Sequence, residues 1–126
     1  MDAWISFRNL LDNVTSGTEY AKLDLIGQRL LEWIAVRNQR EDPLYVQEIV
    51  MKSDVASPAT IHKGIAILER EGLITLVTDQ VDSRRRIVNI SSQAQKLLAK
   101  LSRGVDAWAA SQTSVALGRK SKTFRK

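Results

Sequence analysis

The sequence predicts an α+β fold that is mostly helical and contains one small hairpin of strands. Three observations lead to this fold class. Apolar residues recur at three- and four-residue intervals over most of the chain, which is the period of an amphipathic helix. Two short β-favouring runs, 73–78 and 85–90, are joined by a polar loop. At 126 residues the chain has the length of one domain with one hydrophobic core.

Two helices are expected before residue 40. The first spans residues 2–14, where one face carries large apolar side chains, namely Trp4, Phe7, Leu11 and Val14. The segment VTSGTE interrupts this pattern at Gly17. A second helix is expected from about Glu19 to Gln39, and Pro43 cannot continue it because proline lacks a backbone N–H.

The middle of the chain holds a short strand, a short helix and a longer helix with clear boundaries. PLYV, at 43–46, favours an edge strand, and the following QEIVMKS forms at most two helical turns. Ser57 is a suitable N-cap, and Pro58 fits the first helical position. Gly72 is a suitable residue to follow a last helical turn, so we expect a helix over 57–71.

The two sides of this predicted helix differ in chemistry. Its apolar stripe consists of Ile61, Ile65 and Leu68. The other side of its first two turns carries small or polar residues, namely Ala59, Thr60, His62, Lys63 and Ala66. Because these side chains are short or able to form hydrogen bonds, this side is suited to close approach to a polar surface.

A hairpin and a last helix complete the pattern. LITLVT and RRIVNI become the two strands, and alternation along the second strand points Val88 and Ile90 to the core. On that alternation Arg86 shares their side unless the loop twists it outward, so Arg84 and Arg85 are the better candidates for contact with DNA. A last helix is expected over 93–110, capped by Ser91 or Ser92, followed by a disordered basic tail over 111–126.

This order of elements is a winged helix-turn-helix core, over 18–92, with flanking helices at 1–17 and 93–110. An α-helix fits the major groove of B-DNA, and arginine fits a narrow minor groove. We therefore expect the helix at 57–71 to enter the major groove of double-stranded DNA, with the wing at 79–86 on the minor groove and backbone. The DNA-binding residues expected on this basis are Ser57, Ala59, Thr60, His62, Lys63, Arg84, Arg85 and Arg86.

Two segments make the chain resemble the MarR family of bacterial transcription regulators. SPATIHKGIAILEREGLI resembles the family's recognition helix with its closing LExxGLI, and DQVDSRRRIVNIS resembles its wing. The resemblance, which covers roughly residues 22–92, implies that Arg84 reaches the minor groove. It also implies that Asp82 holds Arg84 in place, so Asp82 joins the expected DNA-binding residues. After the wing, Ala94 stands where the family has a glycine, and the family's ligand response is not carried over.

The two flanking helices are expected to join the chain into a homodimer. The winged core is nearly complete without them, and apolar faces rich in aromatic residues are common at homodimer interfaces. Family members are typically homodimers as well, and a dimer presents two recognition helices to two half-sites. The same faces could instead close the core of one monomer. The residues concerned are Trp4, Phe7, Leu11, Val14, Leu98, Leu101, Val105 and Trp108.

Composition argues against several other classes of function. With no cysteine and one histidine, the chain lacks the usual catalytic and zinc-ligand sets, so we expect neither an enzyme nor a cofactor. No apolar run is long enough to cross a bilayer and the start does not resemble a signal peptide, so we expect a cytoplasmic protein. The net charge of +5 is supplied by five basic residues after residue 118, so it is weak support for DNA binding by itself.

Two other binding functions remain open. The chain could be a winged-helix component of a plasmid or phage replication or maintenance system, which makes the same demands on these residues as promoter control. It could also be a winged helix that binds protein, although the wing arginines and the polar helix face argue against that function.

Overall fold

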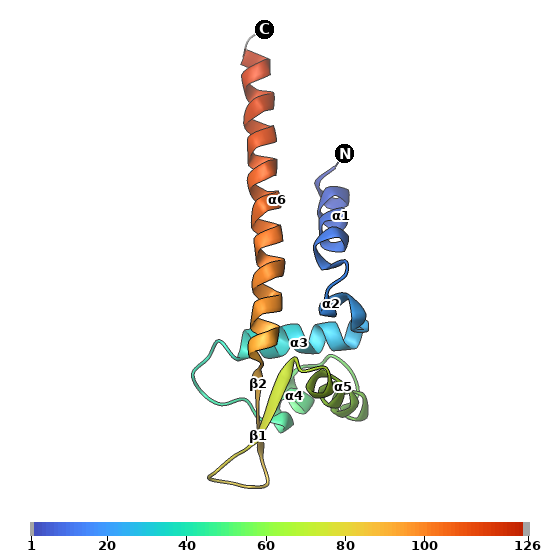
Figure 1. Cartoon of the computed structure of the whole chain (residues 1–126), viewed down its shortest axis with the longest axis vertical. Helices are drawn as coiled ribbons and strands as arrows, with labels where there is room; N and C mark the ends of the chain where they lie inside the picture. Colours follow the sequence, from blue (N-terminus) through green and yellow to red (C-terminus); the bar gives the residue numbers. More distant parts are fainter. Residues whose placement is uncertain (1, 125–126) are drawn as a thin grey trace. The chain divides into compact units, whose positions relative to one another are not determined.

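The order of elements in the structure follows the prediction from the sequence. A computed structural model describes the backbone of residues 2–124 and the side chains of residues 2–113. Its elements are α1 (Ala3–Thr15), α2 (Glu19–Lys22), α3 (Leu25–Arg37), α4 (Val46–Lys52), α5 (Pro58–Arg70), β1 (Ile74–Thr78), β2 (Arg86–Ile90) and α6 (Ser92–Phe124). The fold is therefore mostly helical with one two-stranded antiparallel sheet, as predicted (Figure 1).

The chain forms two compact units. One unit is residues 19–97, and the other combines the residues up to 18 with those from 98 onward. The winged core predicted at 18–92 lies almost entirely within the first unit, and its exact bounds stay a prediction. In the part of the chain that the structure describes, no helix combines the length and the apolar character that crossing a membrane requires.

The core of the 19–97 unit lies between α3, α4, α5 and the hairpin (Figure 1). Its fully buried side chains are contributed by each of these elements and by the connecting loops: Leu30, Leu31, Ile34, Leu44, Ile49, Ile61, Leu68, Leu73 and Val88. Gly64 on α5 lies against Leu30 on α3, and a Cβ added at Gly64 would come within 2.5 Å of the Leu30 Cδ1 atom. This glycine therefore allows α5 to pack closely on α3.

The outer edge of β2 is covered by other parts of the unit. The Asn38 side chain donates from Nδ2 to the Val88 carbonyl at 3.1 Å and accepts from the Ile90 N–H at 2.8 Å. The Val88 N–H donates to the Leu44 carbonyl at 2.8 Å, and Tyr45 forms an isolated bridge with Ile87. The edge strand predicted at 43–46 is thus reduced to a bridge, because α4 already begins at Val46.

Two predicted helix boundaries were wrong. The helix predicted over 19–39 is divided into α2 and α3, because Asp24 has an extended backbone and its side chain accepts from the Gly27 N–H at 2.7 Å, which starts a new helix. The tail predicted as disordered from Ser111 is instead part of α6, which continues to Phe124. That segment contains Gly118 but no proline, the residue that interrupts a helix most strongly, so α6 can extend through it.

A buried arginine joins α3 to α4. Arg37 is 6% exposed, and its Nε and Nη2 atoms donate to the two carboxylate oxygens of Glu48 at 2.5 and 3.0 Å. Nη2 also donates to Asp42 Oδ2 at 3.1 Å. The hydrogen bond between Arg37 and Glu48 raises the pKa of the arginine and lowers the pKa of the carboxylate, so both groups are charged at neutral pH.

We expect Glu48→Gln to lower the midpoint of thermal unfolding at neutral pH by roughly 4 °C, equivalent to about 1 kcal/mol. Because the pKa of Glu48 lies below its ordinary value of 4.5, its stabilisation is complete above that pH and is lost as the pH falls through the lowered pKa. Thermal unfolding of both proteins, from neutral to strongly acidic buffer, should show the two midpoints converging in acid. A difference that does not change with pH would contradict this assignment.

The second unit pairs α1 with the later part of α6, which run antiparallel to one another (Figure 1). The rings of Phe7 and Trp108 meet edge to face at 5.9 Å, and Trp108 Nε1 donates to Ser6 Oγ at 3.2 Å. Gly104 allows the close approach, since an added Cβ would lie 2.7 Å from Val14 Cγ2. Phe7, Val14 and Trp108 therefore make contacts within one chain, whereas Trp4 remains 66% exposed.

Candidate nucleic-acid interface

Helix α5 begins at a side-chain cap. Ser57 has an extended backbone, its Oγ accepts from the Thr60 N–H at 3.4 Å, and Pro58 occupies the first helical turn. The Ser57 hydroxyl also donates to Thr60 Oγ1 at 2.9 Å. The two predicted DNA-binding hydroxyls are therefore engaged with each other at the start of the helix.

The division of α5 into two faces agrees with its predicted chemistry. Ile61, Ile65 and Leu68 are buried on the core side. The other side exposes Ala59, His62, Lys63 and Ala66, while Thr60 is half-buried. Within the described part of the chain, neither the imidazole of His62 nor the ammonium group of Lys63 has a hydrogen-bonding or ionic partner, so both are open to an external ligand.

The wing is a loop between β1 and β2 with its own internal hydrogen bonds. The Asp79 N–H donates to the Arg85 carbonyl at 2.9 Å and closes the base of the loop. The Asp79 side chain accepts from the Val81 N–H at 3.1 Å, two residues further on. This is the local turn that a short acidic side chain favours, so the base of the wing is ordered.

Asp82 and Arg84 form a forked ion pair on the wing. Nε of Arg84 donates to Asp82 Oδ1 at 3.1 Å, and Nη2 donates to Oδ2 at 3.2 Å. The Arg84 side chain nevertheless remains 88% exposed. Hydrogen bonds from the guanidinium and backbone N–H of Arg84 lower the pKa of Asp82, so this carboxylate is charged at neutral pH.

Arg85 has a different environment from Arg84. Its Nη2 donates to Asp79 Oδ2 at 3.0 Å, and its guanidinium lies 4.3 Å from the centre of the Tyr45 ring. Nε also lies 3.6 Å from Asp82 Oδ2. The side chain is 45% exposed, so part of its charge faces the protein.

Arg86 points outward, although the strand alternation would place it on the core side. It pairs with Thr78 at the loop end of the hairpin, where both residues are exposed. Val88, two residues on, is fully buried as predicted. Among the described residues the Arg86 guanidinium has no hydrogen-bonding or ionic partner, whereas Arg84 and Arg85 each have one.

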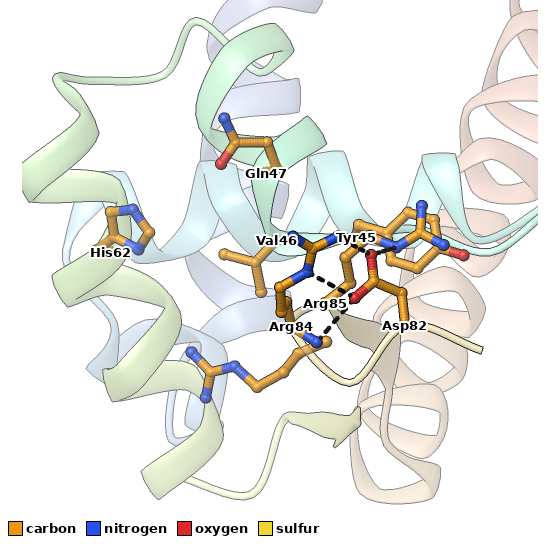
Figure 2. Close-up of a pocket in the computed structure, with 8 residues that line it drawn as sticks. Tyr45, Val46, Gln47, His62, Asp82, Arg84 and Arg85 are labelled. Carbon is orange, nitrogen blue, oxygen red and sulfur yellow. Dashed lines mark hydrogen bonds and ion pairs between the residues drawn. The ribbon is translucent and has the colours of Figure 1, made fainter. Parts of the chain in front are cut away.

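The exposed face of α5 and the wing line one cleft, with a volume of about 640 Å³. Figure 2 shows His62 on the α5 side and the group of Asp82, Arg84 and Arg85 on the wing side. The remaining lining residues are Tyr45, Val46, Gln47 and Arg86. Three arginines against Asp82 in the cleft and Asp79 beside it leave a net positive charge, which suits a polyanion such as a nucleic-acid backbone.

The polar groups of the cleft are mainly hydrogen-bond donors. They are guanidinium, imidazole and amide groups, which form hydrogen bonds with phosphates and base edges. Among the described residues, no group of three or more histidine, aspartate or glutamate side chains could hold a metal ion.

Sequence reasoning missed three residues of this region: Tyr45, Gln47 and Asp79. Tyr45 reaches the wing only because the bridge to Ile87 brings residues far apart in sequence together, and no local pattern indicates that pairing. Asp79 had a local signal, since an aspartate at the start of a polar turn commonly bonds the N–H two residues on.

The fold is similar to that of known transcriptional regulators. The chain matches the S. aureus MepR–DNA complex with a TM-score of 0.67 at 16% identity, covering 96% of this chain and 93% of that one. It matches a MarR-like transcriptional regulator from Thermotoga maritima with a TM-score of 0.62 at 17% identity, covering 100% and 99%. For the crystal structure of MarR the TM-score is 0.56 at 19% identity, covering 98% and 84%.

These likenesses establish the winged-helix fold of MarR-like regulators for this chain, in agreement with the resemblance seen in the sequence. No family model matches the sequence, and no curated protein matches it.

Proposed function

We propose that the chain is a sequence-specific regulator of transcription that binds double-stranded DNA. The observation that carries this proposal is the positive cleft lined by both the exposed face of α5 and the wing arginines. A helix and an arginine-bearing loop placed side by side match the adjacent major and minor grooves of a duplex. The shared fold with MepR, which has been solved in complex with DNA, supports the same role here.

In this proposal α5 enters the major groove and the wing follows the neighbouring minor groove. Ala59 lets the helix backbone approach the base edges, and His62 and Lys63 donate hydrogen bonds to bases or phosphates. Arg84 and Arg86 lie along the minor groove, where the potential is most negative. Asp82 holds Arg84 in the orientation required, which is consistent with their forked hydrogen bonds.

Ser57 and Thr60 are assigned to the phosphate backbone beside the start of α5. Their hydroxyls already cap the helix, so they present a pre-ordered pair of polar groups and not freely rotating donors. The backbone N–H of Ala59 and the positive end of the helix dipole add to the attraction for a phosphate.

The proposal further includes a homodimer, a bacterial cytoplasmic location and no enzymatic activity. Exposed apolar side chains on α1 and α6, with Trp4 the largest of them, support a second copy of the chain as the partner of this unit. Two copies would present two α5 helices to the two halves of a symmetric operator.

The proposal is tested by titrating the full chain into labelled duplexes across a series of salt concentrations. One duplex carries the DNA that flanks the gene of this protein, and the other carries the same bases in shuffled order. We expect tight binding to the first and weaker, strongly salt-dependent binding to the second. Equal binding to both would favour a replication or architectural role, and no binding at low salt would favour a protein partner.

We expect Lys63→Ala to weaken binding to the preferred duplex by about tenfold and to reduce its advantage over shuffled DNA, as loss of a base contact does. The matched control is Lys96→Ala, which removes an exposed lysine from α6. Both variants are titrated into both duplexes. If Lys63→Ala weakens binding to the two duplexes equally, Lys63 contacts phosphate and the base readout is made by other residues of α5.

A further inference from the structure

The three adjacent wing arginines do not share one environment. Arg84 and Arg86 are turned outward, whereas Arg85 is tied to Asp79 and Tyr45. Tyr45 lies outside the wing and immediately precedes α4. Arg85 is therefore the wing arginine whose side chain connects the loop to another part of the 19–97 unit.

The connection continues from Tyr45 to the helix that faces the cleft. The Tyr45 hydroxyl donates to Asp79 Oδ2 at 3.3 Å, so the ring and the carboxylate hold Arg85 between them. The neighbouring Leu44 carbonyl accepts from the Val88 N–H at 2.8 Å, which fixes this segment on β2. Helix α4, which starts at the next residue, packs on α5.

Asp79 is placed to hold this connection rather than to meet a ligand. Its side chain is 9% exposed, and it accepts from Val81 N–H, from the Arg85 guanidinium and from the Tyr45 hydroxyl. Three donors thus engage this buried carboxylate. One hydrogen bond from Nη2 to Asp79 and the position of the guanidinium over the Tyr45 ring fix the orientation of Arg85. Figure 2 shows Arg85 between Tyr45 and Asp82.

We propose that Tyr45, Asp79 and Arg85 are positioning residues that set the wing at a fixed distance from α5. Arg85 acts through its contacts with Tyr45 and Asp79 and not by binding DNA. This inference rests on the proposed DNA-binding function. It assigns the direct wing contacts with DNA to Arg84 and Arg86. It also implies that Asp79 increases the affinity for DNA, although its negative charge by itself would repel the duplex.

The sign of one substitution separates positioning from direct contact. Asp79→Asn removes a negative charge beside the cleft and releases Arg85. If Arg85 binds DNA directly, affinity should rise, because a repulsive charge is gone and the arginine is free. If Arg85 positions the wing, affinity should fall by about fivefold, the cost of ordering a loosened loop on binding. The control is Glu69→Gln, which removes an exposed acid from α5.

A second variant covers the case in which Asp79→Asn fails to fold. Arg85→Lys keeps the positive charge but lacks the planar fork that bonds Asp79 and stacks on Tyr45. If Arg85 positions the wing, Arg85→Lys should bind DNA more weakly and have a salt slope lower by about one. The slope falls although no charge is lost, because Arg84 is no longer held at a phosphate. Wild-type affinity and slope for Arg85→Lys would overturn the inference.

Amide hydrogen exchange of the DNA-free protein tests the same inference without DNA. The Val81 N–H donates to Asp79, so we expect its exchange to quicken about tenfold in Asp79→Asn and in Arg85→Lys. Unchanged exchange in either folded variant would overturn the inference. If the wild-type chain does not bind DNA, the proposed function fails, while quickened exchange would still support the positioning of the wing.

Discussion

Replacing Arg84 and Arg86 together with alanine is expected to weaken DNA binding roughly 10- to 100-fold at moderate salt and to lower the salt slope by about two for each protomer. Both guanidinium groups are exposed on the wing, and each is assigned one minor-groove or phosphate contact. Removing Arg84 also leaves Asp82 without its forked partner, so an uncompensated carboxylate would then face the duplex. Anisotropy titrations at several salt concentrations measure both quantities.

The matched control for this double variant is Arg29→Ala combined with Arg103→Ala, which removes two exposed arginines outside the wing, on α3 and α6. This control lowers the net charge by the same amount, so it should reproduce only the small part of the loss in DNA affinity that comes from long-range electrostatics. If the two double variants weaken DNA binding equally and have the same salt slope, the wing would be a solvated loop that makes no contact with the DNA.

Replacing Trp4 with glutamate is expected to convert a dimer in solution into a monomer and to reduce affinity for a symmetric duplex by at least about 100-fold, because one of two linked half-sites is lost. Trp4 is 66% exposed on α1, with its ring 6.4 Å from that of Phe7. A charge introduced there would be desolvated in a dimer but remain in water in a monomer. Sedimentation velocity measures the oligomeric state directly.

Val36→Glu provides the control for this change. Val36 is also 66% exposed, but it lies on α3 in the 19–97 unit, outside the faces expected to form the dimer. We expect Val36→Glu to leave the oligomeric state unchanged. A wild-type chain that sediments as a folded monomer while binding DNA specifically would exclude the two-fold arrangement.

The elements that the sequence predicted well are those specified by local chemistry. The serine–proline pair predicts where α5 begins, and the apolar stripe predicts how far the helix extends and which face is buried. The hairpin is similarly specified by two β-favouring runs and a polar loop. The exposed side of α5 follows from the same pattern, because the residues left outside the apolar stripe are the exposed ones.

The features that the sequence did not reveal depend on contacts between distant residues. Nothing local indicates that Arg85 would be stacked on Tyr45, since forty residues of sequence separate them and the pairing of Tyr45 with Ile87 brings them together. Likewise, the sequence predicted a dimer interface from the apolar faces of α1 and α6. The spacing of these residues alone could not show that Phe7 and Trp108 meet within one chain. The break at Asp24 was missed because the apolar pattern continues across it.

The most direct test of the account is to map the amides of the protein that change when a short duplex is added, using backbone NMR shifts at low salt. The account requires one DNA surface made from the start of α5 and the wing together. We predict that the largest changes fall in residues 57–66 and 79–86 at the same DNA concentration. Changes confined to α1 and α6, or limited to one of the two predicted segments, would contradict it.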